Sequence, residues 1–170
     1  NGLDIAALYT IGVSVPTSLN QNLKEIYTIL ANFVNSRGVS RDNGNYLHIG
    51  TGNYGAVLLQ KSTKTAWKFS LDAQIERSFL KRLKKQGTQL NVISMGEETV
   101  GPAIQLEYID GRSIDQIMKA ENKLSGDKVL KYSAGIMNGL IELRKAGIWY
   151  HNDIRPANIM IDEEKDRAVI

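Results

Sequence analysis

Hydrophobic positions in this chain first recur at helical spacing and then alternate as in strands. Apolar residues at intervals of three and four predict an amphipathic helix that begins at Ser18, as its N-cap, and ends at Gly38. We expect this helix to pack on the back of the domain that follows; the alternative is a regulatory or partner-binding helix. Three strands are predicted at 46–49, 56–59 and 65–69, where apolar residues lie between glycine-rich or polar turns.

The second half of the chain alternates helical and extended patterns. We predict helices over 72–85, 114–120 and 127–146. We predict strands over 90–95, 103–109, 159–161 and 168–170, the last two forming a hairpin. Gly111 is interpreted as a chain break, and Gly147 as the end of the last helix. The residues expected on the buried face of the first of these helices are Ile75, Phe79, Leu80 and Leu83.

Composition narrows the class of protein. The 170 residues are 42% hydrophobic and 23% charged, which is typical of a soluble globular protein, and we expect a cytoplasmic one. Without cysteine there is neither a disulfide nor a thiolate metal site, and two histidines argue against a His-based zinc site. The net charge of +3 comes largely from 81–85, which is more typical of a solvated helix end than of a docking patch. We predict no nucleic-acid partner, and no membrane span, because no apolar run approaches about 20 residues.

The stretch 150–158 carries the clearest chemistry. Asp153 and Asn158 lie five residues apart, after His151 and before a short apolar run. Phosphoryl transfer needs a carboxylate that orients the attacking hydroxyl and an amide oxygen that holds Mg²⁺. Arg155 would neutralise charge on the transferred group, while His151 is interpreted as a structural residue of the loop.

A glycine-rich turn with Gly50, Gly52 and Gly55 lies between two predicted strands. Such a turn lets the backbone approach phosphates and direct N–H groups at them, although alone it would equally fit a plain hairpin. A following helix would indicate a dinucleotide fold, but here a strand with Val57 follows. Lys68 lies within the next apolar strand, where a buried cation needs an anion, and nucleotide phosphates would supply one.

Glu76 is our candidate for the carboxylate that holds Lys68. Leu80 lies four residues further on, so Glu76 would share its inward helix face. The alternative is that Glu76 is an ordinary exposed helix residue. Glu97 and Glu98, in a turn that follows a glycine, are poorer candidates.

Residues 46 to 170 resemble the protein kinase family. The stretch His151-Asn152-Asp153-Ile154-Arg155-Pro156-Ala157-Asn158 is similar to the family's His-Arg-Asp-Leu-Lys-Pro-x-Asn, and the glycine turn followed by Ala66-x-Lys68 resembles its nucleotide-binding motifs. Asn152 replaces an Arg that pairs with a phosphorylated activation loop in many kinases, which suggests activity without such gating. Arg155 replaces the usual Lys and keeps its charge with a different geometry.

The resemblance implies an α+β fold of two lobes, with an antiparallel sheet and one helix (αC in the family) in the first lobe. We divide the chain accordingly into a helical extension at 1–45, a first lobe with its hinge at 46–109, and a partial, mostly helical second lobe at 110–170. The family's Asp-Phe-Gly motif, whose Asp carries the main Mg²⁺, is expected beyond Ile170.

The resemblance also implies a set of ATP contacts. Leu106 would be the gatekeeper, and the main-chain groups of Glu107 and Ile109 would bind the adenine; otherwise this run is simply an edge strand. Ser113 or Asp115 would contact the ribose. The complete set is Gly50, Thr51, Gly52, Asn53, Tyr54, Gly55, Val57, Ala66, Lys68, Leu106, Glu107, Ile109, Ser113 and Met160.

We therefore expect a serine/threonine protein kinase that transfers the γ-phosphoryl group of MgATP to a protein hydroxyl. The alternatives are a pseudokinase that acts as a binding scaffold, a small-molecule kinase of the aminoglycoside or choline type, and a purely structural domain. The His-Asn-Asp variant and the compact layout look most similar to virulence effector kinases that bacteria secrete, of the YopO and SteC type. That narrower resemblance would imply that the protein is secreted into the host cytosol and that its substrate is a host protein.

Overall fold

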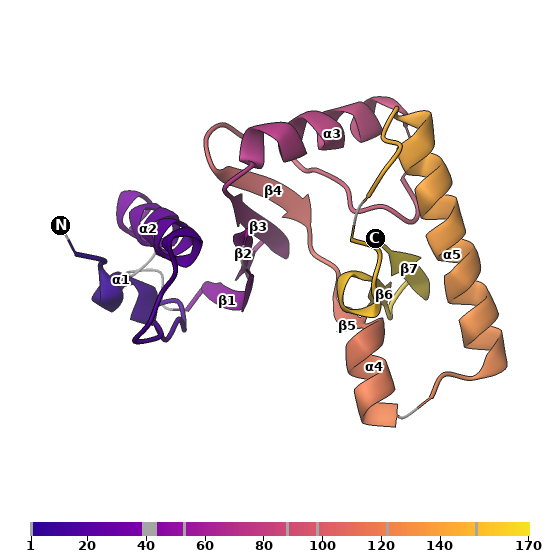
Figure 1. Cartoon of the computed structure of the whole chain (residues 1–170), viewed down its shortest axis with the longest axis horizontal. Helices are drawn as coiled ribbons and strands as arrows, with labels where there is room; N and C mark the ends of the chain where they lie inside the picture. The colour runs from indigo at the N-terminus through magenta and orange to yellow at the C-terminus, as the bar shows by residue number, and fades with distance from the viewer. Residues whose placement is uncertain are drawn as a thin grey trace. The chain divides into compact units, whose positions relative to one another are not determined.

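The computed structural model describes residues 2–38, 44–52, 54–87, 89–97, 99–121, 123–151 and 153–170. Figure 1 traces the chain through its helices and strands. Two compact units emerge, one formed by Asn1–Arg77 with Met95–Tyr108 and the other by Ser78–Ser94 with Ile109–Ile170. Two antiparallel sheets are present among the described residues, one in each unit, so the chain is α+β as expected.

The sheet of the first unit confirms the strands predicted from the sequence. Its strands are β1 (Tyr46–Thr51), β2 (Gly55–Gln60), β3 (Thr65–Ser70) and β4 (Ala103–Glu107), in the order β1-β2-β3-β4. β4 ends two residues before the predicted limit of 109. The sharp turn before β3 places Lys64 at a positive φ of 49°.

The register divides this sheet into two chemically different faces. Ala56 lies opposite Phe69, and Leu58 lies opposite Trp67, so these four side chains share one face. We call it the helix-covered face. The residues that alternate with them form the other face, which we call the lysine face. Its members are Val57, Leu59, Ala66, Lys68, Ile104 and Leu106. The only charged member of that set is Lys68.

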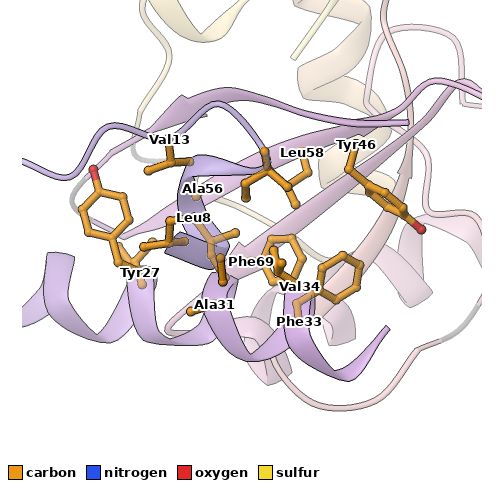
Figure 2. Close-up of a cluster of buried hydrophobic side chains, with 14 of the residues drawn as sticks. Leu8, Val13, Tyr27, Ala31, Phe33, Val34, Tyr46, Ala56, Leu58 and Phe69 are labelled. Atoms are coloured by element: carbon orange, nitrogen blue, oxygen red, sulfur yellow. The ribbon is translucent and has the colours of Figure 1, made fainter. Parts of the chain in front are cut away.

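The helix-covered face packs against the N-terminal part of the chain. Helices α1 (Ile5–Tyr9) and α2 (Gln21–Ser36) share one hydrophobic core with the sheet, and Figure 2 shows their side chains meeting it. The Phe33 ring of α2 lies 4.8 Å from Phe69 and 5.8 Å from Trp67 between centroids. α2 therefore packs on the sheet face opposite Lys68, as the first interpretation of this helix expected.

The start of α2 differs from the prediction. Asn20, not Ser18, is the N-cap, and its side chain accepts a hydrogen bond of 2.9 Å from the backbone N–H of Leu23. Asn and Ser cap equally well, so composition alone does not choose between two sites two residues apart. Helix α1, capped by Asp4, was not predicted, because five residues are too few to establish a helical period.

Helix α3 (Ala73–Lys85) forms where a helix was predicted, but its buried face is narrower than expected. Leu80 and Leu83 are buried, whereas the side chains of Ile75 and Phe79 are 58% and 38% exposed. At 100° per residue the buried face follows Ala73, Leu80 and Leu83, and the other two lie well to its side. The Arg82 guanidinium covers the Phe79 ring at 4.9 Å from its centroid.

The second unit combines a small sheet with longer helices. The predicted hairpin is confirmed by β6 (Met160–Asp162) and β7 (Arg167–Val169), which pair in the order β5-β6-β7 with β5 (Gly111–Ser113). The two predicted helices are confirmed as α4 (Ile114–Glu121) and α5 (Gly126–Lys145). In the part of the chain that the structure describes, no helix combines the length and apolar character that crossing a membrane requires.

Two predictions in this unit are wrong. Gly111 does not break the chain but lies in β5, where a Cβ would come 1.8 Å from the carbonyl oxygen of Ile161. The segment 90–95 is not a strand. Asn91 and Ile93 each form one backbone hydrogen bond of 3.0 Å with Ile170, which is too short a ladder to continue as a strand.

Candidate active site

Lys68 and Glu76 meet on the lysine face of the first unit. Lys68 is the fourth residue of β3, and Glu76 lies in the first turn of α3, which begins a few residues after the strand ends. The Lys68 Nζ atom lies 2.5 Å from Glu76 Oε1, and the two side chains are 36% and 28% exposed. A pair this exposed stabilises the fold little, so it is better suited to hold the ammonium group in place than to support the core.

Apolar residues surround this ion pair on the same face. Val57 lies opposite Lys68 across β2 and β3, and Ala66 lies opposite Leu106 across β3 and β4. Ala66 and Leu106 are buried, while Val57 is half-buried. A cation beside an apolar surface offers complementary groups to a ligand that has both an anionic and an aromatic part.

The turn between β1 and β2 has open space beside two of its glycines. Among the described residues, a Cβ on Gly50 or Gly52 would meet nothing within 4 Å, so there is open space on the side where a side chain would project. At Gly55 a Cβ would come 2.4 Å from the carbonyl oxygen of Phe69, so β2 approaches β3 this closely only with glycine there. The N–H of Gly52 donates to Gly55 O at 2.8 Å, which closes the turn. Asn53, one of the predicted contacts, lies outside the described residues.

The two remaining predicted contacts of this turn are Thr51 and Tyr54. The Tyr54 side chain is 70% exposed, and its carbonyl oxygen accepts a hydrogen bond of 3.1 Å from Leu71 N. The Thr51 hydroxyl lies 2.5 Å from Nε2 of His48, a residue that the sequence had not singled out. No motif marks His48, since its contact depends on an irregularity of β1.

In the second unit, the loop before β6 gathers the predicted transfer residues. The 3₁₀ helix η2 (Pro156–Asn158) turns the chain so that Asn158 returns to Asp153. Asn158 Nδ2 donates to Asp153 Oδ2 at 2.6 Å, and Arg155 Nε lies 3.0 Å from Asp153 Oδ1. The Asp153 side chain nevertheless remains 56% exposed. Its carboxylate is thus oriented by two neighbours and still accessible to a substrate.

His151 takes part in this loop through its ring. Its Nδ1 accepts a hydrogen bond of 3.3 Å from the backbone N–H of Asp153, an arrangement that fits the structural role expected for it. Asn152, the residue that differs from the kinase pattern, lies outside the described residues.

The oxygen donors of this loop fit a hard divalent cation. Because the amide nitrogen of Asn158 binds Asp153, its amide oxygen is the atom left for a cation, and carboxylate and amide oxygens are the ligands that Mg²⁺ takes. Among the described residues, no cluster of three or more His, Cys, Asp or Glu forms a complete metal site. Mg²⁺ commonly completes its shell with water and substrate phosphates, so the amide oxygen of Asn158 would be one ligand among several.

The other predicted nucleotide contacts are divided between the two units. Glu107 ends β4 in the first unit, while Ile109, Ser113 and Met160 belong to the second. The Ser113 hydroxyl accepts from Gln116 N at 3.2 Å, and Gln116 Oε1 accepts from Ser113 N at 2.9 Å. This capping box starts α4 and occupies the Ser113 side chain, and the Ser-x-x-Gln spacing could have revealed it.

Comparison with known proteins gives a consistent result. Residues 45–170 match the family model described as "Protein kinase domain". The chain is 29% identical over 131 residues to serine/threonine-protein kinase ppk31 of Schizosaccharomyces pombe, covering 68% of this chain and 12% of that protein. It is 33% identical over 84 residues to a protein named probable serine/threonine-protein kinase PknB of Bifidobacterium longum, covering 44% of this chain and 12% of that protein.

A third relative matches more narrowly. The chain is 39% identical over 71 residues to the mitogen-activated protein kinase kinase mkk2 of Aspergillus fumigatus, covering 39% of this chain and 14% of that protein. The chain therefore spans 12 to 14% of the length of these three relatives.

Proposed function

Because the chain belongs to the protein kinase family, we propose that it binds MgATP and transfers the γ-phosphoryl group to a Ser or Thr hydroxyl of a protein. The observation that carries this proposal is the lysine face, where the Lys68–Glu76 pair lies beside Val57, Ala66 and Leu106. The names of ppk31 and PknB support a protein Ser or Thr as acceptor.

Nucleotide binding would use the lysine face and the glycine turn of the first unit, and Ile109 and Asp115 are predicted contacts that belong to the second. The adenine would pack on the apolar part of the lysine face, and the main-chain groups of Glu107 and Ile109 would hydrogen-bond to its edge. Lys68, held by Glu76, would bind the phosphates, and the open space beside Gly50 and Gly52 would let them approach the glycine turn. Of the two ribose candidates, Asp115 is the better, because the Ser113 side chain is buried and caps α4, whereas Asp115 is 39% exposed and pairs only at the surface with Lys119.

Phosphoryl transfer would use the loop before β6. Asp153 would accept a hydrogen bond from the substrate hydroxyl and orient it for attack, because its carboxylate is fixed by Asn158 and Arg155 yet exposed. Arg155 would stabilise charge on the transferred group, and Asn158 would hold Mg²⁺ through its amide oxygen. When bound, Mg²⁺ supplies positive charge to the phosphate oxygens.

Three narrower predictions concern secretion, the origin of the substrate and the location of the protein. Secretion as a bacterial effector, and a host protein as substrate, rest on the compact layout and on the Asn152 variant, and Asn152 lies outside the described residues. A cytoplasmic location likewise remains a prediction from composition.

The proposal is tested by phosphoryl transfer from γ-labelled ATP with Mg²⁺. We expect label on Ser- and Thr-containing peptides, less on Tyr peptides, and none on choline or an aminoglycoside. The Asp153→Asn variant should bind ATP and transfer little label. Label on the small alcohols alone would establish the small-molecule kinase instead, and ATP binding without any transfer would establish the scaffold.

A further inference from the structure

A bulge in β1 brings His48 and Thr51 onto one face of the sheet. His48 lies opposite Leu58, but the next paired residue is Gly50, opposite Val57, so Ile49 is an extra residue in this strand. In a regular strand, residues three apart point to opposite faces. The bulge cancels that alternation, and His48 Nε2 lies 2.5 Å from the Thr51 hydroxyl.

The same His48 is bonded to the N-terminal part of the chain through its backbone. β1 is the first strand in the order of its sheet, and the His48 N–H donates 2.9 Å to the carbonyl oxygen of Ile11. Ile11 and Val13 are both buried, so this carbonyl is held firmly against the edge of the strand. Gly12, between them, has a φ of 82°, which makes the turn that presents the carbonyl.

Thr51 lies between two glycines, in the part of the turn with the greatest backbone freedom. Gly50 and Gly52 flank it, and glycine carries the greatest backbone freedom of any residue. Thr51 is therefore the single residue of 50–52 whose side chain can anchor this part of the turn. Burial lowers the pKa of His48, so its ring is neutral at pH 7, and either tautomer can hydrogen-bond to a hydroxyl.

We propose that His48 is a positioning residue that links the N-terminal segment to the glycine turn, through Ile11 on one side and Thr51 on the other. We call these three residues the His48 link. It holds the turn in the conformation that receives the nucleotide phosphates, so the segment before the kinase motifs sets the affinity for ATP. The link itself is a property of the fold, and only its effect on ATP rests on the proposed function.

Amide hydrogen exchange of Gly52 tests the link without nucleotide. The Gly52 N–H is bonded to Gly55 O, so its exchange rate reports how often the turn opens. We expect Thr51→Val and His48→Phe each to raise that rate roughly 3- to 10-fold, the effect of losing one hydrogen bond. The double variant should add nothing further, and Thr51→Ser should restore the parent rate. Additive effects, or an unchanged rate, would overturn the link.

A substitution at Gly12 tests the N-terminal side of the His48 link. Gly12→Ala places a side chain at positive φ and should disturb the Ile11 carbonyl, raising exchange at His48 and at Gly52. Gly2→Ala is the matched control, because a Cβ there meets nothing within 4 Å. If Gly12→Ala raises exchange at His48 but not at Gly52, the two ends are not coupled and the proposal fails.

Kinetics separate positioning from general destabilisation. Thr51→Val and His48→Phe should raise the KM for ATP by a similar factor and leave the KM for the peptide unchanged. Thr63→Val, an exposed threonine in the turn before β3, should change neither. Equal loss of kcat in all three variants would contradict the proposal. If exchange responds as expected but the parent protein binds no ATP, the link stands as structure and its role in ATP binding fails together with the proposed function.

Discussion

Lys68 and Glu76 form an ion pair with 2.5 Å between Nζ and Oε1, although a change from strand to helix lies between them. The pair lies on the sheet face that alternates with the core-forming face, so the fold places it beside Val57 rather than among the aromatic residues. The same alternation that buries Trp67 and Phe69 thus leaves the ammonium group on the accessible side. The hydrophobic core and the candidate nucleotide site are two sides of one sheet.

Asp153→Asn should lower kcat by about 10²- to 10⁴-fold, the usual contribution of a group that takes a proton in the transition state. The KM for ATP should change little, because the carboxamide keeps the shape of the side chain. Steady-state kinetics with a peptide substrate give both values. Asp127→Asn, in the exposed first turn of α5, serves as control and should be silent. An undiminished kcat would remove Asp153 from the mechanism.

Phe33→Ala should destabilise the protein by about 3 to 5 kcal/mol, because the ring is buried among Tyr46, Trp67 and Phe69. Lys24→Ala, on the exposed side of the same helix, should stay within about 0.5 kcal/mol. Urea unfolding measures both. A loss below about 1 kcal/mol for Phe33→Ala would mean that α2 is not part of the core.

Gly111→Ala should destabilise the second unit by about 1 to 3 kcal/mol, since its Cβ would lie 1.8 Å from a backbone oxygen that has little room to move. Gly126→Ala is the matched control, because a Cβ there meets nothing within 4 Å and α5 begins at this residue. We expect it to be neutral or stabilising. Equal melting temperatures for the two variants would contradict the close approach of β5 and β6.

His48 should make the protein less stable as the pH falls. Burial lowers the pKa of His48 below its ordinary value of 6.5, so the unfolded chain binds this proton at higher pH than the folded one. Stability should therefore decrease as the pH falls below about 6.5, until the folded ring is protonated as well. Unfolding free energies between pH 8 and about 5 should show this slope in the parent and a weaker one in His48→Gln. The same slope in both would assign it to another group.

Most elements could be predicted because their signals are local. The strands β1 to β3 and the glycine turn follow from alternation and turn composition, and helix α5 follows from a long periodic run with Gly147 after it. The approach of Glu76 to Lys68 could also be predicted, because a helix that follows a strand closely has few residues able to face that strand.

What the sequence could not predict depends on distant contacts. Gly111 reads as a chain break until Ile161 is seen against it, and Ile75 reads as core until the direction of α3 is known. The hydrogen bond between His48 and Thr51 depends on the β1 bulge, and no residue type in the strand predicts that bulge. In each case the residue type was informative, but the partner that gives it meaning lies elsewhere in the fold.

The most direct test of the central claim is the melting temperature of the protein with and without ATP and Mg²⁺. We predict stabilisation by about 2.7 kcal/mol when ATP is at a hundred times its Kd. The shift should be absent in Lys68→Met and retained in Lys61→Met, an exposed lysine in the turn after β2. If ATP leaves the parent protein unchanged, or stabilises Lys68→Met as much as the parent, the lysine face is not the nucleotide site.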